Sequence, residues 1–274
     1  MCGRVIQSSA PIRLAIVEGL DVRDSRFHNY PPRWNGAPSQ ELLVIRRNRK
    51  TGELSLDPLR WGLIPYFCAD PNGGRKPINA KCETVRTLPT FRDAYRRRRC
   101  ILPVDGFFEW KAIKGQRAKQ PYAIGMKDGS PFGLGGLWEN WKNPATGEWV
   151  RTFAIITTDA NEMVAEIHDR MPLILAPNDY ARWLGEEPDP GDLMRPFPAE
   201  PMRMWPISTR VNKPENDDPF ERRAHRFGKF CWVGIQAYSP PLCAETLSMP
   251  GVSSMRCLSA EAGGPAMRSL QSLR

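Results

Sequence analysis

Short apolar runs separated by Gly, Pro or polar residues are the main pattern along this chain. Runs of a few residues that are rich in Val, Ile and aromatic side chains are typical of β-strands. Strands are therefore predicted over residues 42–45, 100–104, 107–110, 121–127, 132–138, 149–158 and 173–175. A chain with many short strands and few helices favours a β-rich α+β fold.

Apolar residues three or four positions apart predict four short helices. They are expected over residues 11–20, 91–96 and 159–168 and from Pro177 to Gly185. Thr90 is expected to cap the second helix, and Thr158 or Asp159 the third, because their side-chain oxygens can satisfy the first backbone N–H groups. The segments 29–40 and 211–219 are rich in turn residues and are predicted to be loops.

The composition changes after about residue 235. From Ser239 onward the chain consists mainly of Ser, Ala, Gly and Pro with little periodicity, which is typical of a disordered tail. The sequence shows no internal repeat and no clean boundary before this point. We therefore expect one folded domain over residues 1–235 and a disordered tail over 236–274.

Charge and cysteine content narrow the function classes. The formal net charge of +9 favours an anionic partner, with nucleic acid as the leading candidate. Nine Trp offer faces for base stacking, although most are expected in the core. Seven Cys without a C-x-x-C pair indicate neither a disulfide framework nor a zinc site. A polar start, with no signal peptide and no apolar run of about 20 residues, indicates a cytoplasmic protein outside the membrane.

Cys2 follows the initiator Met1, and its small side chain is compatible with removal of Met1 by methionine aminopeptidase. The mature chain would then begin with a free α-amine and a thiol on one residue, with pKa values of about 8 and about 8.5. Such a 1,2-aminothiol can form an imine with an aldehyde and close to a thiazolidine, or its thiol can attack an acyl group. The alternative is a cysteine without a role at a frayed terminus.

Three further side chains are candidates for acid–base or orienting chemistry. Glu109 lies between Phe108 and Trp110, where burial would raise its pKa and suit it to proton transfer. Strand alternation could equally turn Glu109 to solvent. His168 is one of only three His and is the strongest general acid–base candidate, with a cation at a helix C-terminus as the alternative. Asn79 could orient a hydroxyl or an amine through two hydrogen bonds, or could simply occupy a turn.

Several basic residues lie close in sequence to these groups and could hold phosphates beside a reacting centre. They are Arg4, Lys81, Arg92 and Arg170. The basic run at 96–99 is either a solvated face or a phosphate-binding edge. Walker A, Gly-rich dinucleotide-binding and H-E-x-x-H motifs are absent from the sequence, which removes the commonest cofactor classes. We expect no metal and no organic cofactor.

Several short motifs occur in an order that is found in one protein family. They are Met-Cys-Gly-Arg at 1–4, Trp-Gly-Leu-Ile-Pro at 61–65, Asn-Ala-Lys-Cys-Glu-Thr at 79–84, Asp-Gly-Phe-Phe-Glu-Trp at 105–110, Ile-His-Asp-Arg-Met-Pro at 167–172 and Val-Asn-Lys-Pro-Glu-Asn-Asp-Asp-Pro at 211–219. With these motifs, which span most of residues 1–220, the chain resembles the SOS response-associated peptidase-like (SRAP) family. The resemblance implies a single α+β domain of curved, mostly antiparallel β-sheets with a few short helices.

The resemblance also implies a function in DNA damage. Family members bind single-stranded DNA at abasic sites and form a covalent thiazolidine crosslink through the N-terminal Cys, which shields the lesion. On this basis Cys2 would be the nucleophile and Asn79 would orient it. Glu109 would handle protons, and His168 would assist opening of the sugar ring.

The DNA contacts that the resemblance implies are Arg4, Pro38, Trp61, Phe67, Lys81, Arg92 and Arg170. Lys81 stands where the family usually has Arg, so a bidentate phosphate clamp would become a point charge. The expected partner is single-stranded DNA that contains an abasic site, and the protein is expected to act as a monomer. Two rival functions remain open. One is an autoprocessing N-terminal-nucleophile cysteine peptidase, in which Cys2 attacks a peptide carbonyl, and the other is a non-catalytic binder of single-stranded DNA.

Overall fold

The structure is a computed structural model, and it describes residues 2–20, 27, 29–48, 50–70 and 76–219. The chain divides into two units, Met1–Phe227 and Gly228–Arg274, and the second unit lies outside the described residues. The tail predicted over 236–274 and the domain end predicted at 235 therefore also lie outside them.

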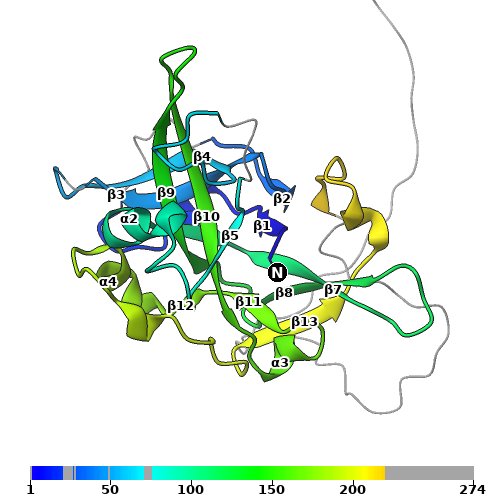
Figure 1. Ribbon diagram of the computed structural model, residues 1–274. Helices are drawn as coiled ribbons and strands as arrows, with labels where there is room; N and C mark the ends of the chain where they lie inside the picture. Colours follow the sequence, from blue (N-terminus) through cyan, green and yellow to red (C-terminus); the bar gives the residue numbers. More distant parts are fainter. Residues whose placement is uncertain (1, 21–26, 28, 49, 71–75, 220–274) are drawn as a thin grey trace, which may run out of the picture. The chain divides into compact units, whose positions relative to one another are not determined.

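Five strands form an antiparallel sheet that includes the beginning of the chain (Figure 1). In sheet order they are β13 (Met202–Pro206), β8 (Gln120–Met126), β7 (Gly106–Lys111), β1 (Val5–Gln7) and β2 (Arg33–Gly36). Val5 of β1 pairs with Phe107 of β7 on one side and with Gly36 of β2 on the other. The first residues of the chain are thereby held inside the sheet, next to the strand that carries Glu109.

The second sheet contains eight strands, and part of it closes on itself. In order they are β11 (Arg170–Pro172), β10 (Trp149–Asp159), β4 (Leu54–Trp61), β3 (Glu41–Arg47), β6 (Arg99–Val104), β9 (Phe132–Lys142) and β12 (Ile174–Leu175), with β5 (Asn79–Lys81) beside β10. Strand β9 also pairs with β10, so β10, β4, β3, β6 and β9 form a small barrel. The pairs of β10 with β4 and with β5 are parallel, whereas the other pairs are antiparallel.

The helices are short and lie around the sheets (Figure 1). They are the α-helices α1 (Pro11–Leu14), α2 (Pro89–Arg97), α3 (Glu162–Ala165) and α4 (Tyr180–Leu184), and the 3-10 helices η1 (Pro177–Asp179), η2 (Gly191–Leu193) and η3 (Thr209–Asn212). Phe91, Ala94 and Tyr95 are the buried residues of α2, and they pack into the same core cluster as Trp183 of α4.

Within the described ranges, buried side chains form three clusters. The first lies between α2, α4 and the barrel and includes Tyr95 and Trp183. The second contains Cys2 together with Phe107 and Ile155, and so connects the beginning of the chain to both sheets. The third packs Ile6 and other side chains on the opposite face of the five-stranded sheet. Cys2 therefore belongs to the core, and the alternative of a frayed terminus does not hold.

The predicted fold class is confirmed, because mostly antiparallel sheets, a small barrel and a few short helices make up the described chain. The strands predicted over 121–127, 132–138 and 149–158 correspond to β8, β9 and β10. The helix predicted from Pro177 to Gly185 is present as η1 followed by α4. Pro177 occupies the first helical turn, where its missing N–H group costs no hydrogen bond.

The other helix predictions need correction. The first helix ends at Leu14 instead of continuing to 20, and Ile12 of its predicted apolar face is exposed. The third helix is only Glu162–Ala165, because Asn161 rather than Thr158 or Asp159 caps it by accepting a hydrogen bond from the Val164 N–H at 2.9 Å. Helices this short depend on tertiary packing, so sequence periodicity alone does not set their ends.

Three further segments differ from the prediction. Thr90 does not cap α2, because the helix begins one residue earlier at Pro89. The predicted loop 29–40 contains β2, which completes the edge of the five-stranded sheet. In the basic run, Arg99 is buried, and its guanidinium donates to the backbone carbonyls of Tyr95, Trp183, Gly185 and Glu187. Arg99 therefore satisfies backbone carbonyls at the ends of α2 and α4 and is not part of a solvated face.

Candidate functional site

Cys2 is held just before β1, in the core between the two sheets. The side-chain amide of Asn79, on β5, donates a hydrogen bond to the Cys2 carbonyl at 2.8 Å. The Cys2 thiol lies 4.0 Å from the carbonyl oxygen of Arg4. Burial raises the pKa of this thiol, and the nearby carboxyl of Glu109 raises it further. Cys2 is therefore a protonated thiol at neutral pH in this arrangement.

Glu109 lies on β7, the neighbour of β1, and only 3% of its surface is exposed. Phe107, two residues earlier, packs in the cluster of Cys2, whereas Phe108 packs on the opposite face of the sheet. Strand alternation thus turns Glu109 toward Cys2 and not toward solvent. Burial raises the pKa of Glu109, and its electrostatic interaction with His168 acts in the opposite direction. A carboxyl with a raised pKa can exchange a proton near neutral pH.

His168 follows α3 and lies within electrostatic reach of Glu109. Its Nδ1 accepts a hydrogen bond from the backbone N–H of Arg170 at 3.0 Å. Asp169 Oδ1 lies 2.8 Å from the same nitrogen, but a nitrogen that accepts from an N–H group has no proton to give. Because a backbone N–H is always a donor, we assign the ring proton to Nε2. Nε2 is then the ring nitrogen that can donate a hydrogen bond to a ligand.

Two polar atoms near Cys2 are buried without a hydrogen-bond partner among the described residues. They are Oδ1 of Asn79 and Oγ1 of Thr157. Thr157 shares a face of β10 with Ile155, which packs in the cluster of Cys2. Orphaned buried polar atoms are rare and indicate a group that a ligand or water completes. The sequence analysis missed Thr157, although its place two residues after Ile155 on an apolar strand was a usable signal.

The structure places Arg170 in a network of its own. Its guanidinium donates to Glu83, to Asp159 at 2.8 Å and to the carbonyl of Thr157 at 2.7 Å. The hydrogen bond from Arg170 lowers the pKa of Glu83 to about 2. A phosphate at Arg170 would compete with both carboxylates. Lys81, which pairs with Thr157 across β5 and β10, is exposed.

Arg4 is likewise engaged by the protein. It donates to Asn35 Oδ1 at 2.9 Å and to the carbonyls of Val211 and Asn212 at 2.6 and 3.2 Å. Arg92, on α2, is half exposed and lies 3.8 Å from Asp93. Of these two arginines, Arg92 is the more exposed, whereas Arg4 is only partly exposed.

The aromatic candidates divide into one core residue and one surface residue. Trp61 is 1% exposed, stacks on Phe153 with ring centroids 6.0 Å apart and donates to the Ile78 carbonyl at 2.9 Å. A DNA base cannot reach its ring in this structure. Phe67 is 55% exposed and packs edge-on against Tyr66, whose hydroxyl lies 3.4 Å from Asp93 of α2. The surface residue Phe67 therefore lies beside the helix that carries Arg92.

The sequence-predicted site thus separates into three groups, of which one consists of Arg4, Trp61 and Arg170, whose side chains bond to the protein. Cys2, Asn79, Glu109 and His168 come together, as the contacts and electrostatic interactions above show. Arg92, Phe67 and Lys81 lie at the surface, and Pro38 is partly buried in the turn after β2.

No helix among the described residues is long and apolar enough to cross a membrane.

The fold and the site define a β-rich protein with a candidate cysteine nucleophile. The cysteine is buried between a small barrel and an antiparallel sheet, near a carboxyl, an imidazole and an amide. The sequence model of the family described as "SOS response associated peptidase (SRAP)" matches residues 1–214. The chain belongs to this family.

Individual relatives agree with this assignment. The chain is 40% identical to the abasic site processing protein YoqW of Bacillus subtilis (strain 168) over 194 residues, which cover 69% of this chain and 85% of YoqW. It is 32% identical to the abasic site processing protein YedK of Escherichia coli (strain K12) over 189 residues, covering 68% and 81% of the two chains. A crystal structure of a protein from Bacteroides thetaiotaomicron matches with a TM-score of 0.73 and 26% identity, covering 82% of this chain and all of that one.

Proposed function

We propose that this protein processes abasic sites in single-stranded DNA by forming a thiazolidine crosslink through Cys2, after removal of Met1. The observation that carries the proposal is the grouping of the buried Cys2 and Glu109 with the partly exposed Asn79 and His168, in a chain whose relatives are named abasic site processing proteins. The net charge of +9 suits a DNA substrate.

The reaction begins with opening of the abasic sugar. In its closed form the sugar hides its aldehyde as a hemiacetal. His168 donates the proton on Nε2 to the ring oxygen and the ring C–O bond breaks, while the C1 hydroxyl passes its proton through water back to the imidazole. The sugar is left as a free hydroxyl and an aldehyde, and His168 ends in its starting form. The unpartnered Thr157 Oγ1 offers a further hydrogen bond to a sugar oxygen.

The Cys2 amine then attacks the aldehyde carbon. Glu109 accepts the proton that the amine loses and returns it to the departing hydroxyl, so that one water leaves and an imine remains. The Asn79 amide holds the Cys2 carbonyl at 2.8 Å and fixes the direction of attack. The thiol finally adds to the imine carbon, and its proton moves to the nitrogen. This ring closure is intramolecular and is favoured for that reason.

Surface residues would hold the DNA on either side of this centre. Lys81 is exposed on β5, next to Asn79, and Arg92 and Phe67 are exposed near each other at α2. The lysine and arginine would neutralise phosphates, and the phenylalanine would stack a base. We propose that this chemistry needs no metal or organic cofactor, because every bond change above uses side chains and water alone.

The test is a denaturing gel of the purified protein with an oligonucleotide that carries one abasic site. The expected result is a heat-stable band with wild type, none with an undamaged strand and none with Cys2→Ala. Mass spectrometry should give the sum of protein and DNA minus one water. Cys2→Ser serves as the matched control, because it retains the amine and should give only an imine that needs borohydride for trapping.

A peptidase is the rival that the family description suggests. In that case the purified protein would cleave peptides through Cys2 and leave abasic DNA unmodified. A wild-type protein that begins at Cys2 and still forms no crosslink would therefore contradict the proposal.

A further inference from the structure

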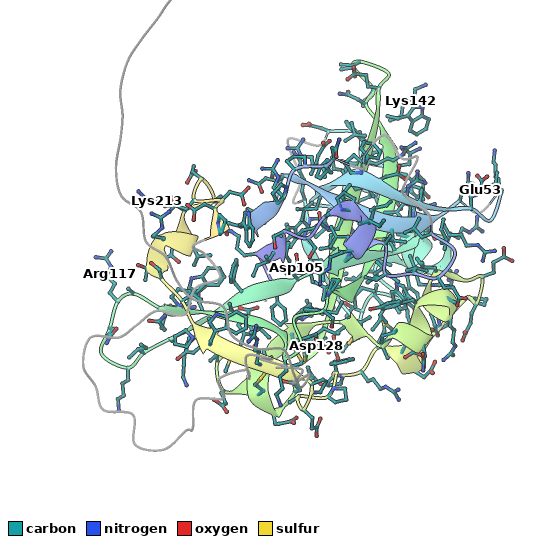
Figure 2. All side chains as sticks on the ribbon, turned by 180° about the vertical axis from the view of Figure 1, so that it is seen from behind. Glu53, Asp105, Arg117, Asp128, Lys142 and Lys213 are labelled. Carbon is teal, nitrogen blue, oxygen red and sulfur yellow. The ribbon has the colours of Figure 1, made fainter. Side chains whose placement is uncertain are left out.

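Residues 209–218, here called the strap, comprise η3 and the loop that follows it (Figure 2, where Lys213 marks the strap). The strap contains most of the motif at 211–219, to which the mechanism above gives no role. It lies in the sequence more than 200 residues after Cys2 and returns to the first strand of the chain, since the Arg4 side chain contacts it over a separation of 207 residues.

The strap covers the face of the five-stranded sheet that is opposite to the reacting groups. Val211 packs in the third core cluster with Ile6 and Phe108. Their strand neighbours, including Phe107, pack in the cluster of Cys2. Because alternate side chains of a strand point to opposite faces, the strap and Cys2 lie on different sides of the same two strands.

Asn35 of β2 holds the strap through its amide nitrogen and Arg4 through its amide oxygen, and its exposed fraction is 0%. The amide nitrogen donates to the carbonyls of Val211, Lys213 and Asn216 at 3.1, 3.0 and 3.0 Å. The amide oxygen accepts from Arg4 Nη1 at 2.9 Å. Loss of this donor would remove one hydrogen bond from each of the three carbonyls and leave the Asn216 carbonyl without the amide it faces, which is costly.

Asp217 holds the other end of the strap. Its Oδ1 accepts from the backbone N–H groups of Trp34 and Asn35 at 2.5 and 2.8 Å, and its Oδ2 lies 3.3 Å from the Arg33 guanidinium. A carboxylate that accepts backbone N–H groups and faces a guanidinium makes strong, charge-assisted bonds. The strap is therefore fixed to β2 at both of its ends.

The strap in turn contacts the residues next to the reacting pair. Arg4, two residues after Cys2, donates to the carbonyls of Val211 and Asn212 at 2.6 and 3.2 Å. Trp110, the residue after Glu109, donates its indole N–H to Asn212 Oδ1 at 2.7 Å. The Arg4 carbonyl also accepts from the Phe108 N–H at 3.1 Å and lies 4.0 Å from the Cys2 thiol.

We propose that Asn35 and Asp217 are positioning residues that clamp the strap to the sheet and thereby fix Cys2 relative to Glu109. On this view the Arg4 side chain links the strap to the first strand by hydrogen bonds and does not contact a phosphate. The inference rests on the crosslinking function proposed above. A shift of about 1 Å in a reacting group can lower a rate by about 10²-fold, so a loosened clamp slows the chemistry without removing a reacting atom.

The test compares Asn35→Asp with wild type in single-turnover crosslinking at saturating DNA, below the measured melting temperatures of both proteins. The substitution keeps the size of the side chain and the oxygen that accepts from Arg4, but it replaces the donor to three carbonyls by an acceptor. We expect the rate to fall by about 10-fold to 100-fold. Affinity for a strand with a tetrahydrofuran abasic analogue, which cannot open, should stay within about twofold.

The controls use exposed side chains of the strap itself. Lys213→Ala and Glu215→Ala change the charge of the strap without touching the clamp, since Lys213 meets Asn35 through its backbone carbonyl. Both should crosslink at the wild-type rate. The double variant Asn35→Asp, Asp217→Asn should be no slower than the slower single variant, because residues that act as one unit are not additive.

Amide hydrogen exchange tests the clamp without DNA. Exchange of residues 3–8 should accelerate in Asn35→Asp and stay unchanged in Lys213→Ala. A wild type that forms no crosslink would defeat the proposed function, while the exchange result would still decide whether the strap holds the first strand. Unchanged exchange, or a wild-type rate for Asn35→Asp, would overturn the inference. So would an Arg4→Gln variant whose DNA affinity falls and whose salt dependence drops by about one phosphate.

Discussion

Glu109→Gln separates the chemical role of a buried carboxyl from its structural role. Glu109 is 3% exposed, and burial raises its pKa, so the ionised form is the less favourable one in the folded protein. Gln has nearly the same size and cannot ionise. We therefore expect the variant to keep the fold and to lose the group that accepts the proton of the Cys2 amine.

General acid–base groups contribute roughly 10²-fold to 10⁴-fold to a rate. The single-turnover crosslinking rate of Glu109→Gln at saturating abasic DNA should fall within that range, which corresponds to about 3–5.5 kcal/mol at about 1.4 kcal/mol for each factor of ten. DNA affinity should not change, because Glu109 acts on the reacting sugar and amine, while the affinity comes mainly from phosphate contacts.

The free energy of unfolding should not fall with the crosslinking rate. The pKa of Glu109 is higher in the folded chain than in the unfolded chain, where it is about 4.3. Its contribution to stability is then fully present below the unfolded pKa and is lost as pH rises through the folded pKa. Glu109→Gln removes this loss. Urea unfolding at pH 8 should find the variant at least as stable as wild type.

Glu139→Gln is the matched control, because Glu139 is also buried with a pKa raised by burial. It pairs with Arg98 at 2.5 Å and lies on the barrel strand β9. Removing its charge leaves Arg98 without its carboxylate and should cost about 1–3 kcal/mol, with an unchanged crosslinking rate. A wild-type rate for Glu109→Gln, or an equal loss of rate in Glu139→Gln, would refute the reasoning.

Three further predictions follow from the site. Phe67→Ala should weaken binding of undamaged single-stranded DNA by about 1–3 kcal/mol in a fluorescence titration and leave the melting temperature unchanged, whereas Trp61→Ala should lower the free energy of unfolding by about 3–5 kcal/mol. Arg170→Gln should remove the stabilisation linked to the Glu83 pKa of about 2. Because the Glu83 pKa is depressed in the folded protein, wild type loses this contribution to the free energy of unfolding as pH falls from about 4.3 toward 2. Arg170→Gln lacks the contribution and should not show this loss in acid unfolding. Lys81→Arg should tighten DNA binding without changing the rate at saturation, because a planar guanidinium can hold a phosphate with two bonds; a weaker complex would argue against Lys81 as a phosphate contact.

The strands of this fold could be predicted from the sequence, whereas the closure of five of them into a barrel could not. Runs such as 121–127 and 149–158 are long and rich in β-branched and aromatic residues, so their local pattern decides their structure. The barrel exists because β10 pairs with both β9 and β4, which are far apart in sequence. Pairing between distant segments depends on the whole core, and no local pattern encodes it.

The reacting group was also largely predictable, because few residues could supply its chemistry. Cys2 and His168 are distinctive by position and by rarity. For Glu109 the sequence left two orientations open, and pairing between β7 and β1 selected the buried one. Thr157 escaped notice, because a threonine on an apolar strand becomes unusual only when its hydroxyl is seen to lack a partner.

The arginines were the least predictable residues. The motifs predict that Arg4 and Arg170 contact phosphates, and this stays a prediction; in the structure both side chains bond to the protein. Arg99, in a basic run, is buried under four backbone carbonyls. A guanidinium carries five donors, so it can join strands and loops as readily as it binds an anion. Only the partners of each arginine distinguish these uses.

The state of the Cys2 thiol bears on the choice between crosslinking and peptide cleavage. A cysteine peptidase needs a thiolate, which a neighbouring cation or base stabilises by lowering the pKa. Here burial and Glu109 both raise the pKa of the thiol. A raised thiol pKa is unfavourable for direct attack on a peptide. It is acceptable for a thiol that closes a ring onto an imine on the same residue, because an intramolecular reaction does not need a thiolate that is already formed.

A pH–rate profile distinguishes crosslinking from peptide cleavage. If imine formation limits the rate, the profile should follow the amine and Glu109, and it should keep its shape in Cys2→Ser, trapped with borohydride. A profile that instead required ionisation of the thiol would favour the peptidase.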